Sequence, residues 1–405
     1  MSRSLFGVLK NLRQEVDTTF RDLPWKMDPR TKRCLGRCVQ LLIASRSSRL
    51  SQWAVSAKNR LKKPLYEIKR FSRLLANPRI ERDRLAEQRI GLFRSRIKKD
   101  TPIACDFSSL EWPYAKAVED LCGVWDGAQK KVIQGHWWLK ATARFSSTVR
   151  LPLLSLVFSH KSSSFISMNQ TVIDFVTQLA DLLNSYGIWL FDRGFDHRIL
   201  IEAFLKLGIR FSIRINACRN IWPQPFQEAG FKKKDKILLE KLLTTVSYPF
   251  SMTLPIYKKK TKIGFGFCPI QIPGIGFPLW VIYTSGTHDP LILLTNQPVT
   301  SREEAKRMIR MYASRWGVEE SFRDFNEEFD VQHVMVRTLR RINLLFELAL
   351  WAYSFATTFF DKGKRLLKKL IHLGGRIGIK KKAEQTFGRI LKGLQYLYTH
   401  SAQAP

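Results

Sequence analysis

An apolar run, Gly187-Ile188-Trp189-Leu190-Phe191, stops abruptly at the polar turn Asp192-Arg193-Gly194. A short continuous apolar run bounded by a turn is typical of a strand that is buried on both faces, as in a parallel sheet covered by helices. Helical spacing of apolar residues precedes it over 171–185, and a second helix pattern follows with Leu200, Phe204 and Leu207 on one face. The pattern predicts an α/β fold.

Further strand signals surround this run. Alternating or apolar stretches at 103–105, 131–139, 149–159 and 210–215 predict strands, and 217–300 is rich in Gly, Pro, aromatic and β-branched residues. We interpret the last segment as a β insertion within the α/β unit. Ser301 with Glu304 three residues on forms a capping box, which predicts a helix that begins there and runs well past Glu319.

The charge is strongly basic and unevenly distributed. The chain has 68 Lys and Arg against 34 acidic residues, a net charge of +34, and Pro29–Tyr66 holds ten basic residues and no acidic one. Because apolar residues make up 45% of the chain, it is not a disordered basic tail. Short helices with a positive face predict a DNA-binding domain, with contacts from Arg30, Lys32, Arg33 and Arg37. The alternative is a merely solvated basic face.

Several classes of protein are disfavoured. The six cysteines form no CxxC pair and no zinc-site spacing, which is typical of buried thiols in a reducing compartment. The N-terminus lacks the apolar segment of a signal peptide. The longest apolar stretch, Asn343–Phe360, is interrupted by Glu347, and we interpret it as a buried helix that does not span a membrane. We therefore expect a cytoplasmic protein without a membrane partner.

These observations divide the chain into five regions. We expect a basic helical DNA-binding domain at 1–95, and a C-terminal basic helical region at 346–405 for DNA contact or dimerisation. Between them lie the first part of the α/β core at 96–216, the β insertion at 217–300 and a helix at 301–345 that completes the core.

Two aspartates follow apolar strand signals. Asp192 ends the run at 187–191, and Asp106 follows Ile103-Ala104-Cys105. Ligand sites in α/β sheets lie beyond such strand ends, so both are candidate metal ligands. The alternative for Asp192 is an N-cap of the next helix, a role that we assign to Asp196 instead. The alternative for Asp106 is a turn aspartate.

A third carboxylate lies in the pattern Tyr312-x2-Arg315-x3-Glu319. Spacings of three and four place the three side chains on one face of a helix. A carboxylate there can hold a metal while the arginine and tyrosine grip phosphate. A solvent-facing ion-pair stripe is the alternative.

The motifs Asp192-Arg193-Gly194-Phe195 and Tyr312-x2-Arg315-x3-Glu319 resemble the signature of bacterial insertion-sequence DDE transposases, in particular insertion-sequence family four. The similarity covers about residues 100–345 and includes Asp106 by its position and context. The family's signature continues Glu-x6-Lys, and here the lysine position is Asn326.

The resemblance implies a ribonuclease-H-like core in which Asp106, Asp192 and Glu319 hold two Mg²⁺ ions, with Mn²⁺ as an alternative. It implies cut-and-paste transposition of DNA: cleavage at terminal inverted repeats, a hairpin route, and joining to target DNA by a homodimer in a prokaryotic nucleoid. Tyr312, Arg315, Arg323 and Asn326 would contact DNA, and aromatic side chains would hold a flipped base. The candidates for the base are Trp280 and Trp316, and the basic tip Lys258-Lys259-Lys260 would also contact DNA.

Two other functions remain open. One is a nuclease of the same fold that cuts DNA without joining it. The other is a decayed, non-catalytic DNA-binding derivative: the three carboxylates argue against it, whereas Asn326 argues for it.

Overall fold

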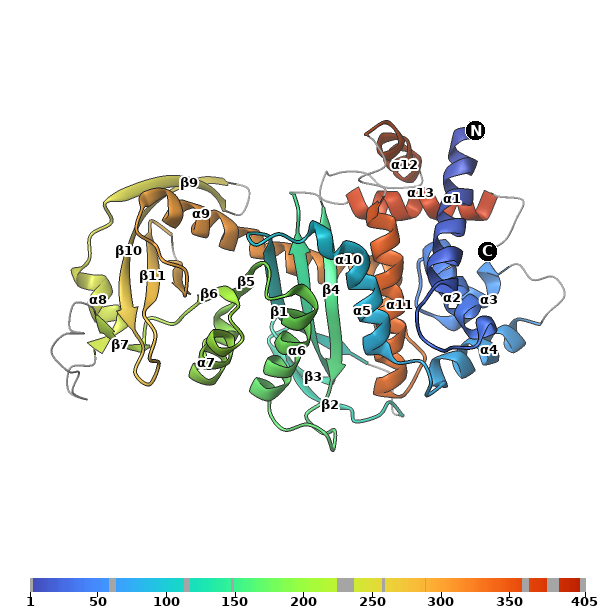
Figure 1. Cartoon of the computed structure of the whole chain (residues 1–405), viewed down its shortest axis with the longest axis horizontal. Coiled ribbons are helices and arrows are strands. Elements are labelled where there is room, and N and C mark those ends of the chain that lie inside the picture. Colours follow the sequence, from blue (N-terminus) through green and yellow to red (C-terminus); the bar gives the residue numbers. More distant parts are fainter. Residues whose placement is uncertain are drawn as a thin grey trace. The chain divides into compact units, whose positions relative to one another are not determined.

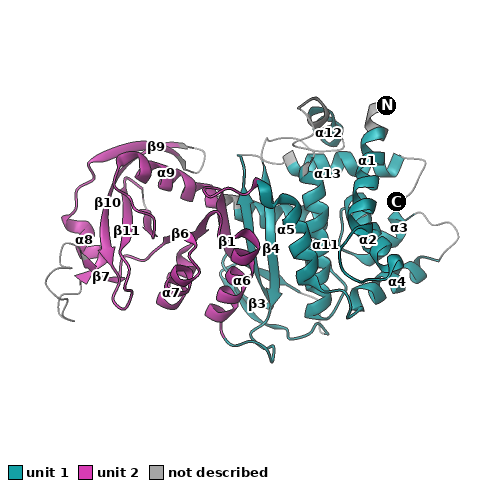
Figure 2. Cartoon of the chain, in the orientation of Figure 1, with its two compact units in different colours: residues 1–95, 107–166, 318–405 teal, residues 96–106, 167–317 magenta. Residues whose placement is uncertain are grey.

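The computed structural model describes residues 3–57, 63–112, 117–146, 149–223, 237–256, 259–287, 289–358, 364–376 and 386–400. Figure 1 labels its helices and strands. The chain forms two compact units, coloured separately in Figure 2. Unit 1 comprises residues 1–95, 107–166 and 318–405, and unit 2 comprises 96–106 and 167–317. No helix in the described ranges is long and apolar enough to cross a membrane.

Unit 1 begins with five helices, and α2 is the central one. Asp28 caps α2 by accepting a hydrogen bond from the Thr31 amide, and Pro29 occupies the first turn, where its missing N–H costs nothing. Apolar residues at helical spacing bury one side of the helix, including Leu35, Val39 and Leu42. The five helices are α1 (Arg3–Arg21), α2 (Pro29–Ser45), α3 (Leu50–Ser56), α4 (Pro64–Ala76) and α5 (Arg82–Phe93).

The sheet of unit 1 is antiparallel. Its long central strand β3 (Lys131–Arg144) pairs with β2 (Cys122–Asp126) and β4 (Arg150–Phe158). Strand β1 (Pro102–Glu111) contributes its residues 107–111 to this unit and its residues 102–106 to unit 2. A Cβ on Gly135 of β3 would lie 2.0 Å from the Leu110 carbonyl oxygen, so the close approach of these two strands requires glycine.

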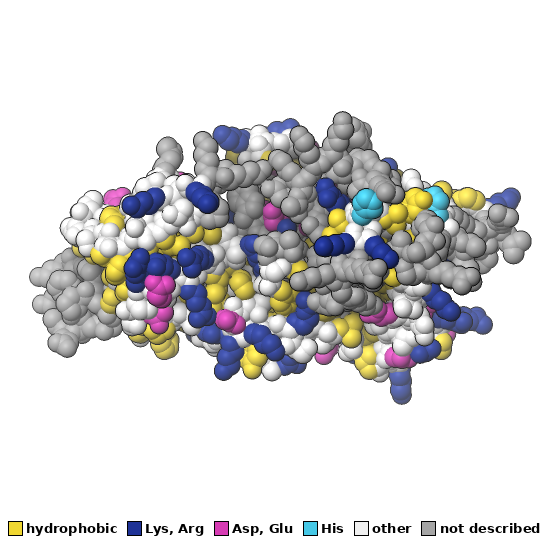
Figure 3. All heavy atoms as spheres, turned by 90° about the horizontal axis from the view of Figure 1, so that it is seen from above, with side chains coloured by type: hydrophobic (Ala, Val, Ile, Leu, Met, Phe, Trp, Pro, Cys, Tyr) yellow, Lys and Arg dark blue, Asp and Glu magenta, His cyan; other side chains and the backbone are white. Residues whose placement is uncertain are grey.

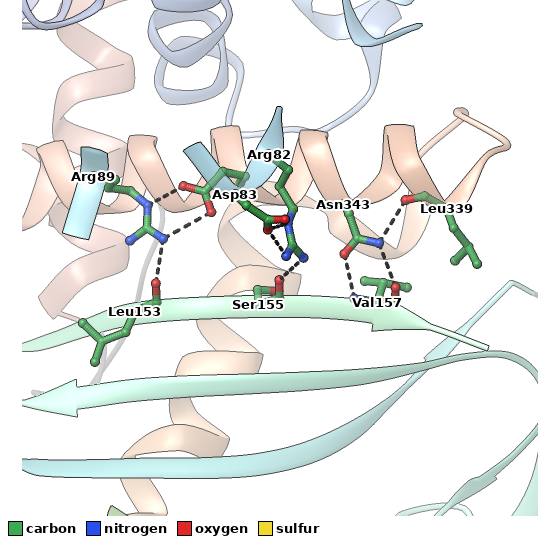
Figure 4. Close-up of polar contacts among 9 residues, drawn as sticks. Arg82, Asp83, Arg89, Leu153, Ser155, Val157, Leu339 and Asn343 are labelled. Atoms are coloured by element: carbon green, nitrogen blue, oxygen red, sulfur yellow. Dashed lines mark hydrogen bonds and ion pairs between the residues drawn. The ribbon is translucent and has the colours of Figure 1, made fainter. Parts of the chain in front are cut away.

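Helices α5 and α11 (Leu339–Thr358) fix β4 through polar contacts, shown in Figure 4. The Arg89 guanidinium is fully buried: its Nε donates to Glu347 (2.7 Å), and it also donates to the carbonyls of Pro152 (3.0 Å) and Leu153 (2.7 Å). Asn343 bonds both the amide and the carbonyl of Val157. The expectation of a buried helix at Asn343–Phe360 is confirmed for the part that the structure describes, which ends at Thr358. Within this helix, Glu347 is neutralised by its ion pair with Arg89.

The unit ends with α12 (Lys364–Arg376) and α13 (Thr386–His400). Helix α13 packs on α12, α2 and α1, and its Ile390, Leu391, Leu394 and Leu397 are fully buried. C-terminal residues therefore complete the core that the N-terminal helices begin.

Unit 2 contains a mixed sheet whose parallel part is β1, β5 (Ile188–Phe191) and β6 (Arg210–Arg214). Helix α6 (Met168–Leu183) precedes β5 and helix α7 (Arg198–Lys206) connects β5 with β6, as the sequence predicted. Gly187 has φ +96°, and a Cβ there would lie 2.4 Å from the Ile103 side chain. Glycine at this position lets β5 start tightly against β1.

The predicted β-rich segment extends the same sheet. Strand β12 (Ile292–Thr295) pairs antiparallel with β6, followed by β11 (Leu279–Ser285) and β10 (Lys259–Gln271). The remaining elements are β7 (Asn220–Pro223), β8 (Ile237–Leu238), β9 (Phe250–Ile256) and α8 (Leu239–Thr245). Both β7 and β9 pair with β10.

Helix α9 (Arg302–Ala313) starts at the predicted capping box, in which Ser301 and Glu304 bond each other's backbone. One turn of 3-10 helix at Ser314–Trp316 then precedes α10 (Gly317–Phe329). The expectation of one continuous α-helix past Glu319 is therefore wrong at this turn. A 3-10 turn changes the angular spacing of the side chains that follow it, so Tyr312, Arg315 and Glu319 do not follow a simple α-helical row.

Candidate active site

The two predicted aspartates lie at matching positions of neighbouring parallel strands in unit 2: Asp192 directly follows β5, whereas Asp106 lies inside β1, which continues to Glu111, so the expectation that Asp106 follows the end of its strand is wrong. The parallel register pairs Ala104 with Leu190 and Cys105 with Phe191, so the next residues along are Asp106 and Asp192. Side chains at matching positions of parallel strands lie on the same side of the sheet. The fold thus brings together two carboxylates that are far apart in sequence.

Asp192 also shapes its own turn. Its Oδ1 accepts a hydrogen bond from the Gly194 amide (2.9 Å) and caps a 3-10 turn at Arg193–Phe195. The N-cap of α7 is His197, without a side-chain bond, so our assignment of that role to Asp196 is wrong. Asp196 instead accepts from the Asn216 amide (2.9 Å) and pairs with Arg219.

Tyr312 and Arg315 of unit 2 belong to the same cluster. Arg315 Nη1 lies 2.5 Å from Asp106 Oδ2, and the Arg315 guanidinium carbon lies 5.8 Å from the centre of the Tyr312 ring. Burial raises the pKa of Tyr312 to about 12; the charges of Asp192 and Asp106 add to this shift, whereas Arg315 and Arg214 oppose it. The tyrosine therefore stays a neutral hydrogen-bond donor at neutral pH.

Sequence reasoning missed an acidic residue that pairs with Arg193, the residue after Asp192. Asp289 Oδ1 lies 3.1 Å from Arg193 Nη2 and 2.6 Å from Arg214 Nη2. The hydrogen bond from Arg214 is the main cause of the lowered pKa of Asp289, which keeps this carboxylate ionised. No sequence signal points to Asp289, because it lies 96 residues from Arg193 in a loop before β12.

Glu319 lies in unit 1, at the start of α10. The residues after it fasten this helix to the sheet: Lys140 Nζ donates to the Ser321 carbonyl (2.8 Å), and Arg150 Nη1 lies 2.7 Å from Glu320 Oε2. Lys140 is fully buried above the Phe325 ring, at 3.8 Å, and burial lowers its pKa. A rigid support of this kind is what a metal-binding carboxylate requires.

The other residues that the resemblance places on DNA have varied surroundings. In unit 1, Arg323 is exposed, and Asn326 is half-buried with an Oδ1 that has no hydrogen-bond partner in the described part of the chain. In unit 2, Trp280 is half-buried on β11, between Pro269 and Thr295 of the adjacent strands. Trp316 lies in the 3-10 turn, and its side chain is outside the described residues.

The basic residues predicted to bind DNA divide into three groups. Arg30 and Arg33 are exposed on α2, and Arg37 is half-buried. Lys32 instead donates to the carbonyls of Arg21 and Leu23 at the end of α1, which occupies its ammonium group. Lys260 is exposed on β10, whereas Lys258 and the Lys259 side chain lie outside the described residues. Figure 3 shows one face on which Lys and Arg clearly predominate over Asp and Glu.

The carboxylate oxygens of the two paired aspartates suit Mg²⁺, which prefers carboxylate oxygen. Asp106 is 7% exposed, and one of its two carboxylate oxygens pairs with Arg315. Asp192 is half-buried. Within the described ranges, no three His, Cys, Asp or Glu side chains form a ready-made metal site. The structure thus brings Asp106, Asp192, Tyr312 and Arg315 together in unit 2, while Glu319 is positioned by unit 1.

Comparison with known proteins identifies a family for this chain. A family model described as a transposase DDE domain matches residues 104–355, which include all three carboxylates. Among solved structures, the chain is similar to piggyBac transposase in a cryo-EM synaptic complex with hairpin DNA, with 12% identity, 99% of this chain and 80% of that chain covered, and a TM-score of 0.43. No curated protein matches in sequence.

The predicted fold class is confirmed: a mixed sheet with helical flanks, consistent with a ribonuclease-H-like core. The family model covers more than half of the chain, and its range contains Asp106, Asp192 and the Tyr312–Glu319 signature. The chain belongs to the DDE transposase domain family.

Proposed function

We propose that this protein is an active, metal-dependent DNA transposase of the insertion-sequence family four type. The observation that carries the proposal is the matched register of Asp106 and Asp192 on neighbouring parallel strands, with Tyr312 and Arg315 of the signature packed beside them. A structural role alone does not require two carboxylates and an arginine at one sheet edge.

Asp106, Asp192 and Glu319 would hold two Mg²⁺ ions, or Mn²⁺. When bound, such a metal pair supplies an activated nucleophile and stabilises the leaving oxygen of a phosphodiester. Arg315 and Tyr312 would orient the phosphate, the arginine through its paired N–H groups and the tyrosine as a neutral donor. Glu319 would supply the third carboxylate from the rigid start of α10.

We further propose the cut-and-paste route. The active site would cut at terminal inverted repeats, form and reopen a DNA hairpin, and join the freed 3′-hydroxyl to target DNA. Trp280 and Trp316 are the candidates to stack on a flipped base. A homodimer would hold both ends, with the basic helices of unit 1 on the DNA.

The test compares Asp192→Asn with the matched control Asp181→Asn, which changes an exposed aspartate on α6 of the same unit. The substrate is a supercoiled plasmid that carries the DNA flanking this gene. We expect Asp192→Asn to reduce Mg²⁺-dependent cleavage by about a thousandfold or more while DNA binding stays within about twofold, since a metal ligand is lost but no phosphate contact. Normal cleavage by this variant would exclude Asp192 as a ligand.

The strand-transfer products distinguish a transposase from a nuclease. We expect hairpin ends on the excised DNA and joined products in a target plasmid, both absent with Asp192→Asn. Cleavage without either product would instead identify a nuclease of the same fold. DNA binding without any cleavage would identify a decayed derivative.

A further inference from the structure

Helices α2 and α4 of unit 1 enclose a surface hollow lined by five arginines. Arg30, Arg33 and Arg37 come from α2, and Arg70 and Arg73 come from α4. No acidic side chain lines the hollow. The sequence run indicated a basic face on α2, but it gave no sign that α4 adds two arginines opposite it.

Most of these arginines are not neutralised inside the protein. Arg70 Nη1 lies 3.4 Å from the buried Glu67. For Arg30, Arg33, Arg37 and Arg73, the described residues provide no ion pair, and the buried Nε of Arg37 has no hydrogen-bond partner there. The nearby Asp17 of α1 lines an adjoining hollow and accepts from Gln40 Nε2 (2.8 Å). The unit therefore maintains a concentrated positive charge that an external anion would neutralise.

Guanidinium groups bind phosphate oxygens through two parallel N–H bonds, which makes a phosphate the matching anion. The α2 arginines occupy positions 30, 33 and 37 of one helix face, which corresponds to a row of roughly 10 Å at about 1.5 Å per residue. One strand of duplex DNA carries a phosphate about every 3.4 Å along its axis. A row of this length fits consecutive phosphates of a strand better than a single free phosphate.

We propose that this arginine hollow is a docking site for the sugar-phosphate backbone of duplex DNA, separate from the catalytic carboxylates. The site rests on the proposed function for its choice of DNA as partner. It grips one strand between two helices, with α2 following the backbone and α4 closing over it. Such contacts fix the register of the DNA without reading its bases.

The experiment uses the full-length protein and the double variant Arg33→Gln/Arg73→Gln, which removes one exposed arginine from each helix and leaves the Arg70–Glu67 pair intact. The control is Arg79→Gln/Arg94→Gln, which removes two exposed arginines of unit 1 outside the hollow. Both variants lose the same net charge. Binding to a random-sequence duplex is measured by fluorescence anisotropy in EDTA at several salt concentrations.

We expect the hollow variant to bind about tenfold or more weakly, with its log–log salt slope reduced by about one to two, as for lost phosphate contacts. The control should bind within about twofold of the unaltered protein. Equal losses in the two variants would overturn the proposal, because the hollow would then act only as general charge. Thermal unfolding of both variants verifies folding; if the double variant is unfolded, Arg73→Gln with Arg79→Gln as its control provides the same comparison.

Inorganic phosphate distinguishes the two sources of the anion. If it binds the unaltered protein by calorimetry, is lost in the hollow variant, and DNA affinity does not change, the site serves a free anion and the DNA proposal fails. Because binding is measured without metal, a protein that cannot cleave DNA still gives a result. Failure of the catalytic proposal and failure of the DNA-docking proposal can therefore be distinguished.

Discussion

At the residue scale, the decisive contact is between Arg315 and Asp106. The guanidinium lies 2.5 Å from a carboxylate oxygen that a metal ion would also use. A cation at that position competes with the metal for Asp106, yet its N–H groups are also suited to grip the DNA phosphate. We therefore expect this side chain to affect both metal affinity and rate.

We expect Arg315→Gln to lower the Mg²⁺ concentration for half-maximal cleavage a few-fold, because a competing positive charge is removed. The maximal rate should fall by about ten- to a hundredfold, the usual effect of losing a hydrogen bond to a charged group. Titrations of cleavage with Mg²⁺ measure both quantities. Arg315→Lys serves as a control that keeps the charge but loses the paired N–H donors of the guanidinium group. An unchanged Mg²⁺ dependence would contradict competition at Asp106.

Asp289 holds Arg193, which directly follows Asp192, and Arg214 through ion pairs. We expect Asp289→Asn to lower the cleavage rate by about tenfold with little effect on folding, since its carboxylate is largely exposed but orients Arg193 and Arg214. Asp289→Glu should recover part of the rate, whereas Asp181→Asn should leave it unchanged. Equal rate losses in Asp289→Asn and Asp181→Asn would instead point to a general effect of lost negative charge.

At the element scale, strand ends and helix starts could be predicted because their signals are local. The apolar run before Asp192 predicted β5, and Ser301 with Glu304 predicted the start of α9. Strand β2 (Cys122–Asp126) was missed because it has only five residues and mixes polar with apolar side chains. The pairing of Asp289 with Arg193 and Arg214, and the 3-10 turn after α9, depend on tertiary packing that no local pattern encodes.

The contact of α5 with α11 and β4 depends on a buried ion pair. We expect Arg89→Met to destabilise the protein by about 3–5 kcal/mol, because Glu347 would remain charged and unpaired in the core. Burial already raises the pKa of Glu347, an effect that Arg89 opposes. Urea denaturation measures the loss. The double variant Arg89→Met/Glu347→Leu should recover most of the stability, and a loss equal to the sum of the single variants would refute this account.

At the scale of the whole molecule, unit 1 is assembled from three separate stretches of chain. Helix α2 packs against α11 and α13, which follow it by about three hundred residues. Arg13 of α1 lies over the Tyr398 ring, at 4.7 Å, and Gln395 reaches the Ser45 carbonyl. The N-terminal helices therefore share one core with the C-terminal ones.

We expect a chain that ends at Thr358 to lose the fold of its N-terminal helices. It lacks the four fully buried leucine and isoleucine side chains of α13, each worth about 1.5–3 kcal/mol, against a total stability of about 5–15 kcal/mol. Limited proteolysis should cut within α1–α4 of this chain and spare the full-length protein. A chain that ends at His400 is the control; equal resistance of both truncations would contradict the prediction.

This arrangement has a consequence for how the protein is made. During synthesis, the arginine-rich helices α2 and α4 leave the ribosome first, but their packing partners α11 and α13 are translated last. A truncated messenger RNA or an early stop codon is therefore expected to yield fragments in which the arginine hollow is not folded. We therefore expect the folded arginine hollow only in chains that also carry the complete DDE domain.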